Sequence, residues 1–472
     1  MVNLVVKLTR QLSSPVGLAV VLLFGAGPSA RAQQPRPPGL DDSLRVEQVV
    51  ARVLNTYPTL EAARREVDAA AARVGQARSG YWPRVSAVGT YRRQDPVPEV
   101  TVPGGPGGPE GGGAGRSIAI QPNNLYDGHL RVRQTLYDFG TTAARIDRAE
   151  AGRVAARRGV AAERADLAFR AVRAFYTALL AEARVDVQRD QVAQLRRTLG
   201  VVRRQQEAGT ATEFEVQSTR TRLSAARSQL RQFRSERQHQ EAELRRLLGA
   251  PDAALSRRLS GPLVPALTTA DTSRIDADTL AARALRRHPS VRIAEAQTEV
   301  ARRQVRVTNR SDAPTLRLDA QGGVKNGYPG ALNEPRLNES IGLSLRVPLF
   351  DGFATRRQEE EAQAQVQAAE ARLAHTRRRV RTGVEQAASD LRARLDRLAS
   401  TRLRVEQART AARLARTRYE AGTVTNLELL EAETQLQRAR LERSEVRYQV
   451  ILGRYALQRA TGTLLPLSAS AL

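Results

Sequence analysis

The sequence predicts a mainly α-helical protein in which long paired helices alternate with β-hairpins. The first observation is composition: alanine, arginine, glutamine and glutamate are abundant, and aromatic residues make up only 4% of the 472 residues. The second is a Glu-Ala-Gly-Thr turn that interrupts this helical pattern twice, at residues 207–210 and 420–423. The third is strict alternation of apolar and polar residues in short segments, which is typical of strands with one apolar face.

Matching landmarks indicate that the chain is an internal duplication. The same offset of 213 residues separates Gly209 from Gly422 and Asp138 from Asp351. One register therefore relates the two halves, which two unrelated loops would not share. The predicted structural repeats cover residues 33–270 and 271–472.

The first 32 residues have the pattern of a secretory signal peptide. Lys7 and Arg10 precede an apolar run at residues 16–27, and a small-x-small site ends at Ala32, near which cleavage is expected. The apolar run is shorter than the ~20 residues that a membrane-spanning helix needs, so the pattern favours export over anchoring. The absence of cysteine excludes disulfides, thiolate metal sites and a lipid-bearing N-terminal cysteine.

The net charge of +26 does not indicate nucleic-acid binding. Nearly all of the positive charge is arginine, because Lys7 and Lys325 are the only lysines. These arginines are scattered among glutamate and glutamine, whereas a nucleic-acid site gathers basic and aromatic residues into one patch. We therefore expect no nucleic-acid partner.

Each repeat is predicted to begin with two short helices that a proline separates. Asp42 and Ser43 are expected to cap the first helix of the chain. Tyr57-Pro58 separates the pair in the first repeat, and His288-Pro289 separates it in the second. The four predicted helices cover about residues 44–55, 59–80, 279–287 and 290–310.

β-hairpins are predicted at about residues 84–138 and 315–349. Ile341, Leu343 and Leu345 alternate with Gly and Ser, so one face is apolar and the other polar. This alternation is typical of a transmembrane β-barrel, although a soluble hairpin that covers a helix also shows it. Residues 103–115, nearly all Gly and Pro, are predicted to form a flexible loop. The aromatic residues expected at the membrane interfaces are Tyr81, Trp82, Tyr137, Phe139, Phe350 and Phe353.

Four strands are too few to close a barrel, because the smallest bacterial barrels have about eight. Open strand edges are not tolerated in lipid. The barrel must then be shared between identical chains. Two copies supply about eight strands around a filled interior, and three supply about twelve with room for a lumen. The pattern therefore predicts an oligomer without choosing three.

Long helical hairpins are predicted at about residues 141–249 and 354–461. The first helix of each has roughly 67 residues, which is about 100 Å of helix. Apolar residues recur at seven- and three/four-residue spacing along both helices, which predicts coiled-coil packing. At the reversals we expect Gly209 and Gly422 to end one helix in the left-handed conformation. Thr212 and Thr425 are expected to cap the next helix.

With these landmarks, the chain from about Leu44 to Gly462 resembles the TolC-like outer membrane factor family. The resemblance rests on the order and spacing of motifs at residues 77–83, 347–352 and 419–423. It implies a homotrimer in contact with outer membrane lipid, whose twelve-stranded barrel continues into a twelve-helix periplasmic tunnel. It also implies a passive exit duct for tripartite efflux or type I secretion. The implied partners are a periplasmic adaptor (membrane fusion protein) and an inner-membrane transporter, either of the resistance-nodulation-division class or ATP-driven.

The resemblance assigns roles to residues at the helix reversals. Acidic rings just inside the tip are expected at Glu428 and Glu431, and Glu215 is the first-repeat counterpart of Glu428. Carboxylates that converge in a pore focus negative potential, so these residues are candidates for the channel gate. The residues expected to contact the adaptor are Gly209, Thr210, Gly422 and Thr423.

Tyr419 matches a family tyrosine that belongs to the network keeping the tip closed. Its usual arginine partner is replaced here by Val424. Arg416 and Arg418 are therefore candidates for replacing that arginine, and the sequence does not choose between them.

The sequence contains no catalytic constellation. The four histidines lie far apart without metal-ligand spacing, and His288-Pro289 is expected to be a helix break. We expect no enzymatic activity, no cofactor and no metal. The alternative to a duct is a periplasmic coiled-coil structural or adaptor protein without a membrane barrel. Neither hypothesis specifies whether the cargo is a drug, a metal ion or a polypeptide.

Overall fold

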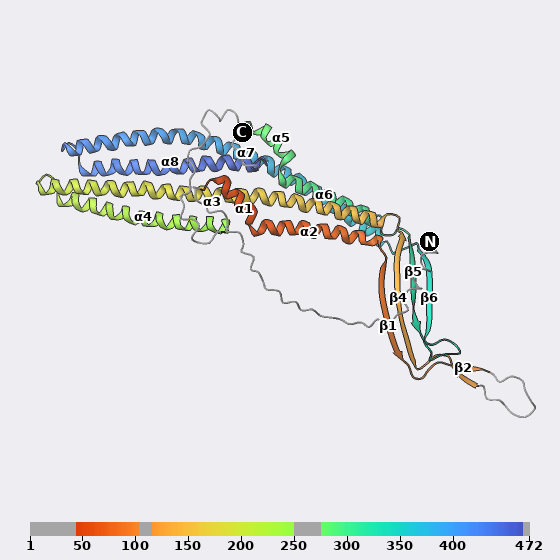
Figure 1. Cartoon of the computed structure of the whole chain (residues 1–472). Coiled ribbons are helices and arrows are strands. Elements are labelled where there is room, and N and C mark those ends of the chain that lie inside the picture. Colours follow the sequence, from red (N-terminus) through yellow and green to blue (C-terminus); the bar gives the residue numbers. More distant parts are fainter. Residues whose placement is uncertain (1–43, 103–115, 250–274, 466–472) are drawn as a thin grey trace, which may run out of the picture. The chain divides into compact units, whose positions relative to one another are not determined.

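Two long helical hairpins are the largest elements of the computed structural model, which describes residues 44–102, 116–249 and 275–465 (Figure 1). Helix α3 (Thr141–Glu207) reverses into α4 (Glu213–Leu248), and α7 (Ala354–Glu420) reverses into α8 (Asn426–Ala460). α3 and α7 each contain 67 residues, which is about 100 Å of helix. Both hairpins begin and end within one residue of the predicted bounds.

Several predicted features lie outside the described residues. They are the signal peptide, the caps Asp42 and Ser43, the Gly/Pro loop at residues 103–115 and the junction between the repeats near residue 270. Helix α7 begins and ends 213 positions after α3, in agreement with the offset of the sequence landmarks. The division into repeats at residue 270 stays a prediction.

The heptad positions form a hydrophobic core between the hairpins. On α3, Val185, Leu195 and Val202 are buried, and they pack in one cluster with Leu429 and Leu430 of α8. A fully buried side chain of this size contributes about 1.5–3 kcal/mol relative to an exposed one. This burial confirms the predicted coiled-coil packing. A second cluster joins α7 and α8 to two shorter helices and includes Ala284, Val291, Leu391, Leu395, Val446, Val450 and Leu457.

Short helices α1 (Val46–Thr56), α2 (Pro58–Arg78), α5 (Ala277–Arg287) and α6 (Pro289–Thr308) precede the strands in each half. The proline breaks are confirmed, because α2 and α6 both begin at a proline. The predicted start of the first helix is wrong by about two residues. Helix α1 begins only after Arg45, whose backbone N–H donates to Gln48 Oε1 at 2.9 Å.

The end of the second predicted helix also differs from the structure. Helix α2 stops at Arg78, and a 3₁₀ turn (Ser79–Tyr81) replaces its last residues. The tighter turn follows because Trp82 and Pro83 already have to enter the strand, and a residue before proline avoids the α region. The backbone N–H of Trp82 donates to Ser79 O at 3.1 Å.

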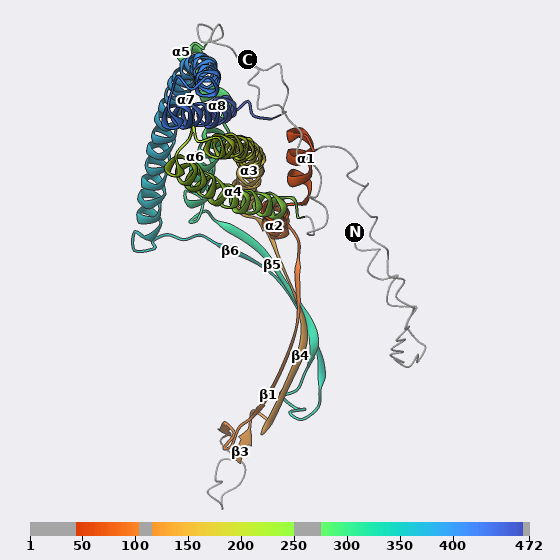
Figure 2. The same cartoon turned by 90° about the vertical axis from the view of Figure 1, so that its left-hand side faces the viewer.

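Four antiparallel strands form one sheet in the order β1-β4-β5-β6. Figure 2 shows β1, β4, β5 and β6 lying side by side in a curved sheet. The central pair, β4 with β5, joins strands from the two predicted repeats. Within this chain β1 and β6 have no further neighbour, so both outer edges of the described sheet are open. The strands are β1 (Arg84–Arg93), β4 (Asn124–Tyr137), β5 (Thr315–Lys325) and β6 (Arg336–Arg346).

A second, two-stranded ladder was not predicted. Strands β2 (Glu99–Val102) and β3 (Arg116–Ala119) pair antiparallel on either side of the Gly/Pro-rich residues. Each strand has only four residues, and so short a segment does not show a recognisable alternation of apolar and polar residues in the sequence.

Strand β4 leads into α3 and strand β6 leads into α7, each through a turn that contains an aspartate. Thr142 N donates to Asp138 Oδ2 at 2.7 Å, and Thr355 N donates to Asp351 Oδ2 at 2.7 Å. The carboxylate accepts from a backbone N–H that the first turn of a helix leaves unpaired. Phe139 and Phe353 lie at these turns in the left-handed region, with φ of 51° and 64°.

No helix within the described residues is both long enough and apolar enough to span a membrane.

Candidate channel gate at the helix tips

Both hairpins reverse through the same backbone turn. Gly209 and Gly422 have φ of +75° and +72°, which an L side chain adopts only with strain. Thr210 N then donates to Gln205 O at 2.8 Å, and Thr423 N donates to Arg418 O at 2.9 Å. These bonds pair carbonyl groups that the end of a helix leaves free. The predicted turns are confirmed, and the four turn residues are all exposed.

The predicted caps form at both tips. Thr212 Oγ1 accepts from Glu215 N at 3.3 Å, and Glu215 Oε2 in turn accepts from Thr212 N at 2.8 Å. At the second tip, Thr425 Oγ1 accepts from Glu428 N at 3.3 Å and donates to Glu428 Oε1 at 3.2 Å. Each threonine therefore caps the first turn of its helix and stabilises it by about 1 kcal/mol.

The three predicted gate carboxylates do not contact one another within one chain. Glu428 and Glu431 are exposed on α8, three residues apart, which places them about one turn from each other. Glu215 is half-buried at the other tip, where the cap holds it. Their role in a gate stays a prediction, because a ring needs several chains.

Tyr419 is 5% exposed and packs in the core with Leu429 and Leu430. Its hydroxyl has no hydrogen-bond partner among the described residues. Burial, and to a smaller degree the charge of Glu215, raises the pKa of Tyr419 to about 12. The side chain is thus positioned at the tip, and its polar end is unsatisfied in this arrangement.

Arg416, one of the two arginines that the sequence offered, contacts a carboxylate that the sequence analysis missed. Arg416 Nη2 lies 3.0 Å from Glu433 Oε1. Arg418 is exposed at the surface of α7. Arg416 therefore binds a carboxylate of α8 that lies five residues, or about one and a half turns, beyond Glu428, and it binds neither of the predicted ring carboxylates of α8.

Glu433 is 3% exposed, and it is the one charged side chain among the buried residues of the described chain. Besides Arg416 on α7, it accepts from Gln194 Nε2 at 2.8 Å and from Thr198 Oγ1 at 3.4 Å. Gln194 and Thr198 both belong to α3. One carboxylate thus connects the first hairpin to both helices of the second.

Further polar contacts continue away from the tip. Gln437 Nε2 donates to Gln188 Oε1 at 3.0 Å, and Gln188 Nε2 donates to Ala226 O at 3.0 Å. Apolar side chains pack in many registers, whereas buried polar groups must meet their partners. These contacts therefore hold the hairpins in one register. We call the following residues the polar seam: Gln188, Gln194, Thr198, Arg416, Glu433 and Gln437.

A sequence signal for the seam exists, although the sequence analysis did not use it. Leu429, Glu433 and Gln437 follow one another at four-residue spacing, so all three share a helix face. Because Leu429 is at a core position, the two polar residues had to be in the core as well. A polar residue at a core position of a coiled coil is a common device for specifying register.

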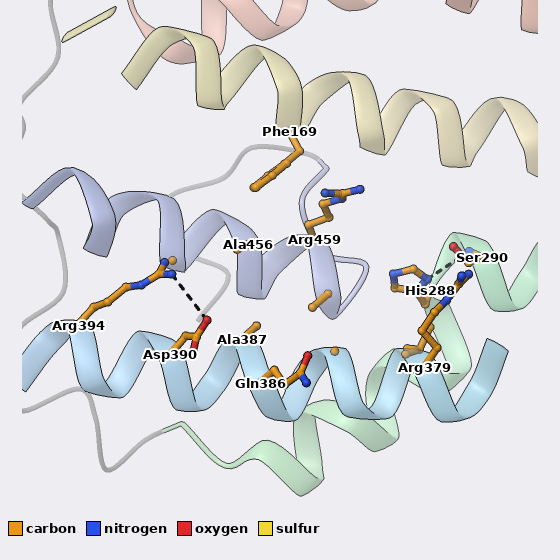
Figure 3. Close-up of a pocket in the computed structure, with 14 residues that line it drawn as sticks. Phe169, His288, Ser290, Arg379, Gln386, Ala387, Asp390, Arg394, Ala456 and Arg459 are labelled. Atoms are coloured by element: carbon orange, nitrogen blue, oxygen red, sulfur yellow. Dashed lines mark hydrogen bonds and ion pairs between the residues drawn. The ribbon is translucent and has the colours of Figure 1, made fainter. Parts of the chain in front are cut away.

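A separate cavity of about 600 Å³ lies at the other end of the second hairpin (Figure 3). His288 borders it as the N-cap of α6, and its Nδ1 accepts from Ser290 N at 3.2 Å. Burial lowers the pKa of His288. The prediction of a helix break is confirmed for this histidine. No group of three or more metal-binding side chains occurs within residues 44–102, 116–249 and 275–465.

The model of the outer membrane efflux protein family matches residues 49–250 and 280–463. The chain belongs to the outer membrane efflux protein family. This membership confirms the predicted resemblance, the outer membrane location with a periplasmic portion, and the function as a channel of efflux and type I secretion systems.

Relatives and solved structures of outer membrane efflux proteins agree with this assignment. The chain is 28% identical to Protein CyaE of Bordetella pertussis, over 95% of this chain and 90% of CyaE. It is 27% identical to alkaline protease secretion protein AprF of Pseudomonas aeruginosa, over 72% of this chain and 70% of AprF. The fold matches the outer-membrane channel OprN with a TM-score of 0.71 at 22% identity, covering 89% of this chain and 90% of OprN.

Proposed function

We propose that the chain is the exit duct of a type I secretion system and works as a homotrimer with a periplasmic adaptor and an inner-membrane transporter. The observation that carries the proposal is the open four-stranded sheet, which leads directly into two helical hairpins of about 100 Å. A sheet spans lipid only when its edges are paired. Both edges of this sheet are available to further copies of the chain.

Two relatives that are named for protease secretion support a polypeptide as the cargo. AprF is named for alkaline protease secretion, and a further relative, PrtF of Dickeya chrysanthemi, is named for secretion of proteases and is 23% identical over 72% of this chain. A duct without an energy source of its own takes its energy from the transporter. We therefore propose that the chain has no enzymatic activity.

The gate of this duct is proposed at the helix tips. Glu428 and Glu431 are exposed on α8, where three chains can bring them together as rings, and Glu215 and Tyr419 support the tip from the side. Trimerisation focuses negative potential in the pore because like carboxylates converge. The adaptor is proposed to contact the exposed turns at Gly209, Thr210, Gly422 and Thr423.

The polar seam is proposed to hold the gate closed. It lies just behind the tip and connects α8 with α3, so outward movement of the second hairpin has to break it. The contacts of Glu433 contribute most to holding the second hairpin in place, because they join it to the first hairpin as well as to α7.

The membrane-facing side of the sheet is proposed to be the apolar one. The aromatic residues at its helix-side end are exposed in one chain, as expected of a girdle in contact with lipid headgroups. Tyr137 and Phe139 pack edge to face with ring centroids 4.7 Å apart, and Phe350 and Phe353 do so at 5.4 Å. The proposed girdle consists of Tyr81, Trp82, Tyr137, Phe139, Phe350 and Phe353.

The test is to purify the protein from outer membranes in detergent, measure the mass of the assembly and record currents in planar lipid bilayers. A trimer that forms ion-conducting pores is expected. A monomer that stays soluble without detergent and gives no pores would contradict the proposal and favour a periplasmic structural or adaptor protein.

A matched pair of variants tests the orientation of the sheet. Ile341→Arg places a charge on the apolar face and is expected to cost about 2–4 kcal/mol per chain in lipid, which abolishes insertion. Ser340→Arg, on the polar face of the same strand, is expected to insert normally. The fraction of each variant in outer membranes is the measurement, and equal insertion of both would contradict the orientation.

A further inference from the structure

The sheet has one face that is strongly basic. In an antiparallel sheet, residues directly opposite each other share a face, and neighbours along a strand alternate. The pairing of Val85 with Val132, Val132 with Ala320 and Ala320 with Ile341 therefore defines an apolar face across all four strands. Every residue next to one of these in sequence belongs to the opposite, polar face.

Eight basic and two acidic residues of β1, β4, β5 and β6 lie on the polar face, which gives a net charge of +6 with histidine neutral. On the apolar face the charged strand residues are Arg93 and Glu339, whose charges cancel. The charged residues of the polar face are Arg84, Arg92, Arg131, Arg133, Arg317, Lys325, Arg336, Arg346, Asp127 and Asp319.

The two acidic residues are already engaged. Asp319 Oδ1 lies 3.0 Å from Arg133 Nε, and Asp127 Oδ1 lies 2.8 Å from His129 Nδ1. Arg84, Arg317 and Arg346 make no ion pair with any residue that the structure describes. The positive charge of the polar face is therefore not neutralised within the sheet.

Like charges also lie directly opposite each other in this sheet. Arg84 is paired with Arg133, and Lys325 is paired with Arg336. Such cross-strand pairs destabilise a sheet relative to neutral ones. Arg336 reaches only the loop residue Glu334, at 4.0 Å. The sheet thus keeps two unfavourable pairs on the face that carries its net positive charge.

We propose that this face lines the barrel section of the duct as an anion-favouring wall, and that the cargo is an unfolded polypeptide rich in aspartate and glutamate. The inference rests on the proposed function, because only a closed barrel turns this face toward cargo. In a trimer the wall has three times six, or about eighteen, positive charges in a water-filled space surrounded by lipid. Such an arrangement concentrates the field on the lumen.

The acidic tip does not cancel this wall. The tips lie at the far end of helices α3 and α7, about 100 Å from the strands. The Debye length at physiological salt is about 8 Å, so each charged region acts on its own surroundings. Cargo therefore meets two separate regions of opposite sign, and the basic one is in the barrel.

The experiment measures ion selectivity of the trimer in planar bilayers under a KCl gradient. To remove the contribution of the tip, it uses the Glu428→Gln/Glu431→Gln background. In this background the reversal potential is expected to show preference for chloride. The added changes Arg84→Gln, Arg317→Gln and Arg346→Gln are expected to lower the chloride-to-potassium permeability ratio by about twofold or more. Arg93→Gln, on the apolar face, is the matched control and is expected to leave the ratio unchanged.

Block by peptides tests the same wall without changing the strands. Poly-glutamate added to the wild-type channel is expected to block the current in a voltage-dependent manner, and poly-lysine is expected to block the barrel section much less. Pores of the Glu428→Gln/Glu431→Gln variant that conduct without preferring chloride, or wild-type pores that poly-glutamate does not block, would overturn the proposal of an anion-favouring wall. The proposed function as a duct would still hold. Absence of any pore in the wild-type protein would instead overturn the proposed function.

Discussion

Removing the guanidinium of Arg416 while keeping an unbranched apolar stem is the sharpest test of the polar seam. In Arg416→Met, Glu433 keeps Gln194 and Thr198 but loses the one ion pair that it makes with a described residue. Breaking a buried pair from one side costs about 3–5 kcal/mol. The Glu433 side chain is 2% exposed, but that of Arg416 is 43% exposed. Water therefore already screens the ion pair between Arg416 and Glu433, so we expect its loss to cost about 1–3 kcal/mol of stability.

If the seam restrains the second hairpin, this cost falls on the closed arrangement of the tip. A change of 1–3 kcal/mol shifts a two-state equilibrium by about 5- to 150-fold. Arg416→Met is therefore expected to raise the open fraction, seen as larger or more frequent open currents in planar bilayers. Arg418→Met, two residues away on the exposed surface, is the matched control and is expected to behave like the wild type.

A double variant separates the ion pair from other effects of the substitution. Replacing a buried pair by apolar residues is often neutral or stabilising, so Arg416→Met/Glu433→Leu is expected to close more fully than Arg416→Met. Wild-type currents in Arg416→Met, from a trimer of normal thermal stability, would refute the reasoning. A double variant as open as the single one would show that the buried carboxylate is not the cause.

Three further variants test the tips. Tyr419→Phe removes a buried hydroxyl that lacks a partner, and it is expected to be neutral or to stabilise by about 1 kcal/mol in thermal unfolding. The pKa of Tyr419 in the folded protein is raised from 10.0 to about 12. The wild type should therefore lose stability relative to Tyr419→Phe as the pH rises from 10 to 12. Parallel curves of stability against pH for the two proteins would contradict the burial of Tyr419. Gly422→Ala meets no atom within 4 Å but keeps a φ of +72°, so strain alone should cost about 1–2 kcal/mol; an unchanged melting temperature would mean that the turn adopts another conformation. Thr212→Ala removes a cap and should cost about 1 kcal/mol, whereas exposed Thr221→Ala should cost less; hydrogen exchange of the first turn of α4 measures both.

The sequence was sufficient wherever a few neighbouring residues decide the structure. The period of apolar residues predicted the coiled-coil packing of α3 and α7, and the turn motifs at their ends predicted their approximate bounds. Gly209 and Gly422 with their following threonines predicted both reversals. The alternation of β6 predicted its two faces in the same way. These features depend on backbone sterics, local capping and amphipathic periodicity, all of which act over less than two turns of chain.

Partners far apart in the chain were decided only by the tertiary structure. Glu433 meets Thr198 across 235 positions, and β4 meets β5 across the boundary between the two halves. Local spacing shows that Glu433 faces the core. It does not show which hydrogen-bond donors Glu433 meets, because those donors lie on other helices that only packing brings close. The basic face likewise emerged from strand register, since a shift by one residue would move every one of its charges to the opposite side.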